Sequence, residues 1–189
     1  MYEYKHAIIE NVNNRYWTIF GKCMGWLALG VAVGLLFFYV FKDFSVAAID
    51  RFKFLQGIFG ISEYQEGMLI GRVISTILIA NLISTAAYFT LGYFRLLIPI
   101  AIITGFFIII LLMTGTVRHQ QVIPLEVILL MSGETLYRMI ALTTGEHLHK
   151  NRLRRRWIFI LAAAVVLILY AGMALYEVFQ IFGYIIAPG

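Results

Sequence analysis

The sequence predicts an all-α protein, a polytopic bundle of about five transmembrane helices, with residues 1–189 as a single transmembrane domain. Hydrophobic residues make up 61% of the chain and charged residues only 13%, whereas roughly a quarter of an average soluble domain is charged. Polar side chains cannot cover the surface of such a chain, so lipid must cover much of it. The apolar residues also fall into five runs, each as long as the roughly 20 residues that a spanning helix needs.

The five predicted spans are separated by short polar segments. They cover about 17–41, 70–93, 96–117, 122–145 and 157–183. Only Phe94 and Arg95 clearly separate the second span from the third, which predicts a tight hairpin. The longest connection, 42–69, mixes charges with an apolar patch and is predicted as an outer interfacial loop. A short helix lying in the interface and a loop packed on the bundle are equally compatible with this segment.

The basic residues set the predicted orientation. The net charge is +5, and five bases stand in the segment 150–156 between the fourth and fifth spans. If all five runs span and the N-terminus is cytoplasmic, this block lies inside with Arg15 and Arg95, as the positive-inside rule requires. We therefore predict a multi-pass protein of the cell membrane, with its N-terminus in and its C-terminus out. The positive charge is assigned to topology and anionic lipid headgroups, not to nucleic acid.

The fourth span is the least apolar and carries the residues best suited to chemistry. Glu134 lies ~18 Å along a helix from Val122, which is close to the bilayer midplane. A lone carboxylate at that depth is costly, and Arg138, four residues further on, lies on the same helix face. One interpretation is an ionisable site for protons or substrate. The other, which we favour, is an ion pair that holds helices together.

Four more residues complete the set of candidate site residues. Asn81 in the second span is predicted to hydrogen-bond across helices, an interaction worth about 1 kcal/mol or less. Glu126 and Gly133, seven residues apart, share one face of the fourth span, and Glu126 either caps a neighbouring helix or reaches the outer water. Glu177 lies ~30 Å along the fifth span from Trp157, so it is predicted to snorkel to the outer headgroup layer.

The remaining patterns are interpreted as structural. The first span contains two glycine pairs at a spacing that lets helices approach closely, within a subunit or between subunits. These pairs are Gly21-x-x-x-Gly25 and Gly30-x-x-x-Gly34. His147 and His149 are predicted to lie in a solvated loop, because no second cluster completes a metal site. No phosphate-binding loop or nucleophile–base grouping is recognisable, so we predict no enzyme activity, no cofactor and no metal.

Several short sequence elements follow one another in a characteristic order over about residues 75–182. An Asn precedes a downstream Gly in the second span, another Gly follows in the third, a Pro, a Glu and a Gly come in the fourth, and the fifth ends in small residues and a Glu. The elements are Ala80-Asn81-Leu82, Leu91-Gly92-Tyr93, Thr104-Gly105-Phe106, Pro124, Glu126, Gly133 and Ala174-Leu175-Tyr176-Glu177-Val178-Phe179. This order resembles the stage II sporulation protein M family of integral membrane proteins. The family's His-Gly does not follow Pro124 here, so nothing ascribed to it carries over.

The resemblance implies a polytopic, non-catalytic subunit that assembles with other membrane or envelope proteins. We accordingly predict a scaffold or assembly subunit of a larger membrane complex. Its expected partners are the lipid bilayer and either other membrane proteins or further copies of the same chain. The thin extramembrane mass and the glycine pairs agree with this prediction. The alternative is a transporter or permease component with a midplane path that uses Glu126, Glu134 and Arg138.

Overall fold

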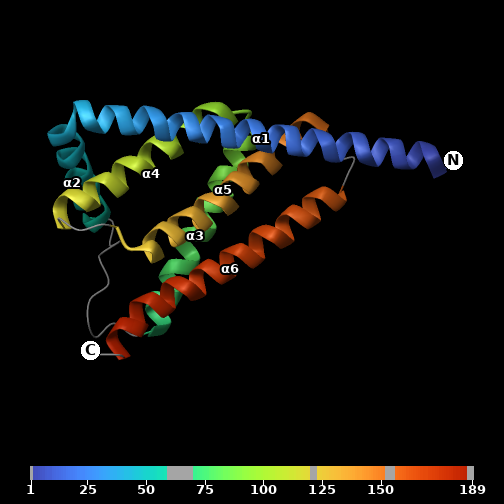
Figure 1. Ribbon diagram of the computed structural model, residues 1–189. Helices are drawn as coiled ribbons and strands as arrows, with labels where there is room; N and C mark the ends of the chain where they lie inside the picture. Colours follow the sequence, from blue (N-terminus) through green and yellow to red (C-terminus); the bar gives the residue numbers. More distant parts are fainter. Residues whose placement is uncertain (1, 59–69, 120–122, 152–155, 187–189) are drawn as a thin grey trace.

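The computed structural model describes residues 2–58, 70–119, 123–151 and 156–186, and six helices account for nearly all of them (Figure 1). In chain order the helices are α1 (Tyr2–Val40), α2 (Lys42–Ile58), α3 (Ile70–Tyr93), α4 (Leu97–His119), α5 (Leu125–Asn151) and α6 (Arg156–Ile186). The all-α prediction is confirmed for this part of the chain. Four segments are long and apolar enough to cross a membrane, namely Arg15–Val40, Val73–Tyr93, Leu97–Arg118 and Phe159–Gln180.

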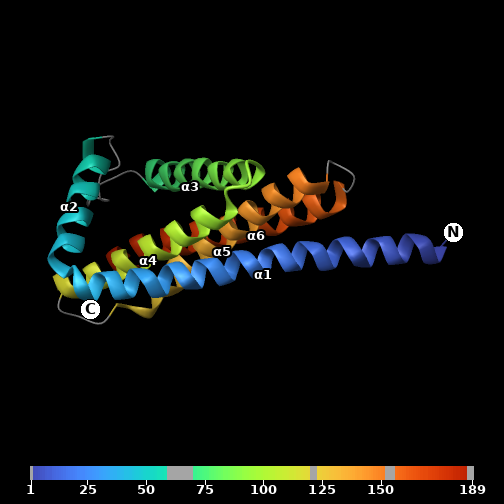
Figure 2. The same cartoon turned by 90° about the horizontal axis from the view of Figure 1, so that it is seen from above.

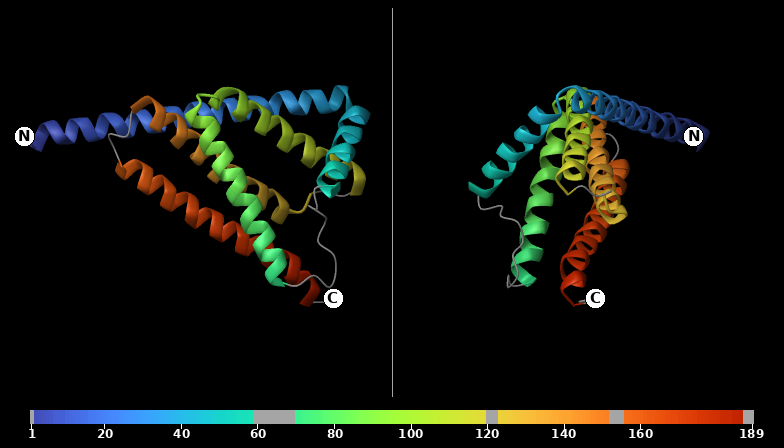
Figure 3. Two further views of the ribbon diagram at one scale, coloured as in Figure 1. Left: turned by 180° about the vertical axis from the view of Figure 1, so that it is seen from behind. Right: turned by 60° about the vertical axis from the view of Figure 1, so that its left-hand side comes forward.

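The long helices run alternately between two ends of the molecule (Figures 1 and 3). α1, α4 and α6 run in one direction, and α3 and α5 run back. The α3–α4 turn, the end of α5 and the start of α6 lie at one end, which we call the entry end. α2 and the starts of α3 and α5 lie at the other, the far end. Residues 2–14 continue α1 beyond the entry end of the bundle (Figure 2).

Two pairs of parallel helices approach each other through glycines. In the first pair, Gly30 and Gly34 of α1 face α4, and Gly105 of α4 faces α1. A methyl group on Gly30 would overlap the Ile102 carbonyl, and one on Gly105 would overlap the Leu27 carbonyl. The two backbones therefore lie closer together than any larger side chain would permit, as is common where membrane helices associate.

The second parallel pair joins α3 to α5 in the same way. A methyl group on Gly92 of α3 would overlap the Leu142 carbonyl, and one on Gly145 of α5 would overlap the Phe89 carbonyl. These two glycines lie near the entry end, where α3 and α5 both finish. The contact holds the second half of α5 against α3.

The other predicted glycine pair of α1 has no packing partner among the residues that the structure describes. Nothing would lie within 4 Å of a methyl group on Gly21 or Gly25. Ala28 and Ala32 continue the same helix face, and all four residues are exposed. α1 therefore has an inner glycine face against α4 and an outer small-residue face, which we call the outer stripe (Gly21, Gly25, Ala28 and Ala32).

The buried core is built around α5. Met139 and Leu142 of this helix are completely buried, and they pack in one cluster with Cys23 of α1 and Ala101 of α4. α5 contacts four other helices, α1, α3, α4 and α6. Two smaller clusters join α1, α2 and α4 at the far end and α3 with α6. Their buried members are Phe38, Ile49 and Ile110, and Val73, Ile77 and Ala174.

The hairpin predicted between the second and third spans is present, and Arg95 makes the turn. Arg95 has a left-handed φ of 66°. Its N–H donates to the Gly92 carbonyl (2.9 Å), and the N–H of Leu96 donates to the Leu91 carbonyl (3.0 Å), a pattern that ends many helices. Pro99 stands in the first turn of α4, where its missing N–H leaves no intrahelical bond unmade.

α5 differs most from its predicted span. The helix covers Leu125–Asn151 instead of 122–145, and it is not among the four apolar segments. The prediction that His147 and His149 lie in a solvated loop is wrong, because both belong to the helix. His147 is only 5% exposed, and its ring centre lies 5.4 Å from that of Tyr16. α5 continues this far because α1 runs beside it and gives its last turns a surface to pack against.

The predicted interfacial loop, 42–69, begins with a helix. α2 lies across the far end, and Ile49 is 3% exposed in the cluster with α1 and α4. Asp50 forms an ion pair with Arg118 at the end of α4. The described part of this connection is thus a helix packed on the bundle. The side chains of the apolar patch, from Phe52 onward, lie outside the described residues.

Candidate functional site

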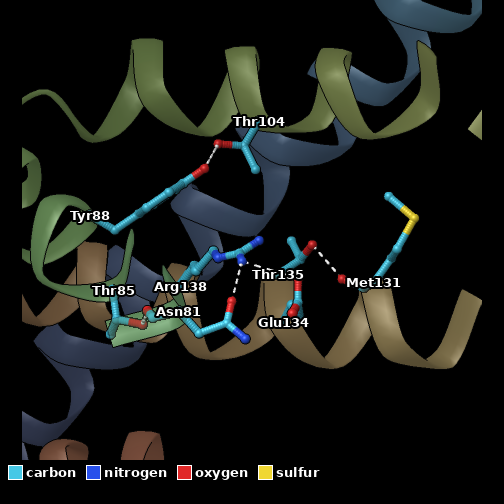
Figure 4. A network of polar contacts seen from close by, with 8 residues as sticks. All are labelled: Asn81, Thr85, Tyr88, Thr104, Met131, Glu134, Thr135 and Arg138. Carbon is cyan, nitrogen blue, oxygen red and sulfur yellow. Dashed lines mark hydrogen bonds and ion pairs between the residues drawn. The ribbon is translucent and has the colours of Figure 1, made fainter. Parts of the chain in front are cut away.

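Three polar side chains meet between α3 and α5 (Figure 4). Glu134 and Arg138 project from successive turns of α5 and form the expected ion pair, with Arg138 Nη2 3.1 Å from Glu134 Oε2. The same Nη2 donates a hydrogen bond to Asn81 Oδ1 of α3, also at 3.1 Å. Asn81 is 8% exposed, and the Glu134 and Arg138 side chains are 19% and 21% exposed. These three residues form what we call the polar cluster.

The cluster combines a charge pair with a hydrogen bond between helices. A guanidinium has five N–H donors and no acceptor, so it can serve a carboxylate and an amide oxygen at once. Arg138 also lies beside the ring of Tyr137, with its guanidinium carbon 5.7 Å from the ring centre. Its Nε is buried and has no hydrogen-bond partner among the described residues. Nη2 therefore makes both polar contacts, and the N–H of Nε remains available as a donor.

A half-open cavity of about 270 Å³ lies beside the cluster, between α3, α4 and α5. Its polar lining is contributed by Glu134, Arg138 and three hydroxyl residues, Tyr88, Thr104 and Thr135. Thr104 donates its only proton to the Ile100 carbonyl (2.7 Å), so in the 2.7 Å contact between the two hydroxyls Tyr88 is the donor. The rest of the lining is apolar and consists of Ile103, Phe107, Ile108, Leu111 and Met131.

Glu177 lies near the far end of the apolar segment of α6 and is only partly exposed. It interacts electrostatically with Glu134 and Arg138 across the α5–α6 contact. The snorkelling prediction accounts for the position of Glu177 along α6 but not for these interactions with α5. The sequence did not reveal that α6 packs on this side of α5.

The other two predicted residues stay apart from the cluster. Glu126 stands in the first turn of α5, partly exposed, and makes no hydrogen bond or ion pair with the described residues. Gly133 faces α6, where a methyl group would overlap the side chain of Met173. Of the two roles considered for Glu126, reaching the outer water agrees better with its exposure. Gly133 serves helix packing.

Several hydroxyl groups escaped the sequence analysis because tyrosine and threonine occur throughout apolar spans. Tyr170 of α6 donates to the Leu78 carbonyl of α3 at 2.5 Å. Tyr16 of α1 contacts the Thr144 hydroxyl of α5 at 3.2 Å. Tyr137 is completely buried, and its hydroxyl has no hydrogen-bond partner among the described residues. A sequence pattern that could have indicated some of them is the concentration of hydroxyl residues in the fourth span. This span includes Thr135, Tyr137, Thr143 and Thr144.

The described residues contain no group of three His, Cys, Asp or Glu side chains that could hold a metal ion. The polar cluster places a carboxylate, a guanidinium and an amide in contact, a combination suited to binding helices together or to binding a small polar ligand. No family model, curated protein or solved structure matches this chain.

Proposed function

We propose that the chain crosses the cell membrane five times, with α5 as the fourth crossing and the N-terminus in the cytoplasm. α5 has 27 residues, or ~40 Å of helix, which exceeds the ~30 Å hydrocarbon core. Its contacts with four other helices shield polar groups that lipid would not tolerate. Arg95 stands in the α3–α4 turn, Lys150 stands in the last turn of α5, and Arg15 precedes Tyr16, whose ring contacts His147 of α5. Bases at this end are what the positive-inside rule expects for a cytoplasmic face.

Cysteine labelling tests this orientation. In a Cys23→Ser background, Leu153→Cys should react only with reagents that reach the cytoplasm, and Lys42→Cys only with impermeant reagents added outside. Reaction of Leu153→Cys from outside would contradict the proposed topology, because the basic segment 150–156 would then lie outside the cell.

Within this topology we propose a non-catalytic subunit that acts as a scaffold or assembly partner in a larger membrane complex. The observation that carries the proposal is the use made of the polar groups in the spans. Arg138 bridges α5 to Asn81 of α3, Tyr170 bridges α6 to α3, and Tyr16 bridges α1 to α5. Each of these contacts fixes one helix against another, and in each the polar groups bind to a partner within the same chain.

The outer stripe supports the part of the proposal that concerns partners. Small residues at four successive turns allow another helix to approach closely, which is how many membrane helices associate. α1 uses such a surface on its inner face, through Gly30 and Gly34. The resemblance to the stage II sporulation protein M family also implies a subunit that assembles with other membrane proteins.

Mild-detergent purification with native mass measurement tests assembly. We expect the wild-type chain to carry a second copy or another membrane protein, and Gly25→Leu to lose it while keeping the fold. Gly172→Leu is the matched control, because nothing lies within 4 Å of a methyl group there either. A stable wild-type monomer without partners would overturn the scaffold proposal.

A transporter or permease component is the second candidate, and the cavity beside the polar cluster favours it. The Glu134–Arg138 pair lines this cavity, and the buried Arg138 Nε has no partner among the described residues, so the cavity would offer an ionisable site to protons or to a small polar substrate. Proton flux into proteoliposomes, followed with a pH-sensitive dye, should then be abolished by Glu134→Gln without loss of assembly. If Glu134→Gln instead prevents assembly, the pair has the structural role.

A further inference from the structure

A second, apolar groove lies between α1, α5 and α6, on the entry side of the molecule. It has a volume of about 310 Å³. We call it the α1–α6 groove, because α1 and α6 form its two walls and α5 its floor. Its lining is Tyr16, Trp17 and Phe20 from α1, Leu136 and Ile140 from α5, and Leu161, Ala162 and Val165 from α6.

The lining offers hydrocarbon contacts and almost nothing else. Seven of the eight side chains are apolar or carry only the indole N–H of Trp17 as a polar group. The eighth, Tyr16, uses its hydroxyl in the contact with Thr144, and that threonine donates its own proton to the Ile140 carbonyl. A ligand in the groove therefore binds through apolar surface alone, as an acyl chain does.

The position of the groove specifies the rest of the ligand. Trp17 is 59% exposed and Trp157, in the first turn of α6, is 82% exposed, and exposed indoles favour the level of the lipid headgroups. The chain from Lys150 at the end of α5 to Arg156 at the start of α6 contains five bases and no acid. A cytoplasmic segment with this charge, in the orientation proposed above, attracts anionic lipid headgroups.

We propose that the α1–α6 groove binds one acyl chain of an anionic phospholipid, whose headgroup is attracted by the positive charge of the α5–α6 connection. Basic surfaces between transmembrane helices on the cytoplasmic side are a known setting for anionic lipid headgroups. The bound lipid would fill the space between α1 and α6, which both pack on α5. It would be a resident part of the bundle surface at this end.

Native mass spectrometry of the full chain tests the proposal with two lipids of equal acyl chains, phosphatidylglycerol and phosphatidylcholine. We expect the wild-type chain to retain one phosphatidylglycerol about tenfold more strongly than phosphatidylcholine, and Ala162→Phe, which fills the groove, to reduce that retention about tenfold. Ala164→Phe is the matched control, because Ala164 is exposed on the same helix. Unchanged phosphatidylglycerol retention in Ala162→Phe would overturn the acyl-chain site.

A second pair of variants keeps the test decisive if Ala162→Phe does not fold. Leu161→Trp narrows the groove at a residue that is already 66% exposed, and Ile168→Trp adds the same ring to a residue that is 71% exposed outside the groove lining. Only Leu161→Trp should lose phosphatidylglycerol.

The headgroup requirement is tested separately by replacing Arg154, Arg155 and Arg156 with Gln. The triple variant should bind phosphatidylglycerol only as well as phosphatidylcholine. Equal binding of the two lipids by the wild-type chain would overturn the anionic requirement. A groove occupied by another copy of the chain would instead give a dimer mass that Ala162→Phe abolishes, with no lipid retained, and this outcome would also overturn the proposal.

Discussion

α5 and α6 are neighbours that pack on each other, yet they differ in almost every property that sequence analysis uses. α5 contains Glu134, Arg138 and several hydroxyl residues, and the stretch 137–147 is largely buried. α6 is almost wholly apolar, and its exposed surface carries large side chains. These include Leu161, Leu167, Ile168, Leu175 and Phe179, each at least 59% exposed.

The difference teaches what hydropathy reports in this molecule. The apolar surface of α6 suits contact with lipid, whereas the polar groups of α5 lie where other helices cover them and can satisfy their hydrogen bonds. The most central helix is therefore the one that composition identifies least well. Three changes would test this contrast, and their expected effects on stability become progressively smaller.

The largest effect is expected at the glycines of the two helices. Gly145→Leu would force a side chain into the Phe89 carbonyl of α3, so it should destabilise the bundle by about 3 kcal/mol or more. Gly172→Leu on α6 meets nothing within 4 Å and should leave the unfolding free energy unchanged. Unfolding in mixed micelles measures both. Equal stability of the two variants would mean that α5 is not held against α3 as described.

A smaller loss is expected when the polar cluster is broken on one side. Arg138→Leu leaves Glu134 and Asn81 without their shared donor and should cost about 2 kcal/mol, the lower range for a buried pair because both side chains remain about one-fifth exposed. The double variant Glu134→Leu with Arg138→Leu should recover most of this loss, since no unpaired charge remains. A double variant as unstable as the single one would show that the pair itself stabilises the fold.

The smallest effect is expected at the hydroxyl that joins α6 to α3. Tyr170→Phe removes the hydrogen bond to the Leu78 carbonyl and should cost about 0.6 kcal/mol, the average for such bonds in a membrane protein. Tyr39→Phe is the control, because Tyr39 is 71% exposed and should not change the midpoint of thermal unfolding. A loss above about 2 kcal/mol for Tyr170→Phe would show that the α3–α6 contact contributes more to stability than the comparison of α5 with α6 predicts.

The elements that the sequence predicted well are those set by local chemistry. The α3–α4 hairpin follows from two residues between long apolar runs, and the Glu134–Arg138 pair follows from their helical spacing. The candidate site was predicted incompletely because its other contacts join distant elements. No local pattern in the sequence indicated that Asn81 would lie beside Arg138, or that Glu177 would interact with the charges of α5.

Other differences follow from the same cause. His147 was placed in a solvated loop because charged neighbours surround it in the sequence, but α1 buries it in the folded chain. Spacing alone did not distinguish the two glycine pairs on α1. Gly30 and Gly34 contact α4, whereas a methyl group on Gly21 or Gly25 would meet no described residue within 4 Å. Only the position of α4 determines which glycine pair of α1 is buried and which is exposed.

If α5 is the fourth crossing, as proposed, its polarity also determines how the chain can enter the membrane during its synthesis. An Arg and a Glu near the centre of a helix disfavour insertion by about 2.5–3.5 kcal/mol each, so α5 emerging alone would remain in water. Asn81 of α3 is made earlier and is already in place, and α6, which is strongly apolar, follows after a short basic connection. We therefore expect α5 and α6 to insert together as a hairpin, and a nascent chain that stops at Asn151 to leave α5 outside the bilayer.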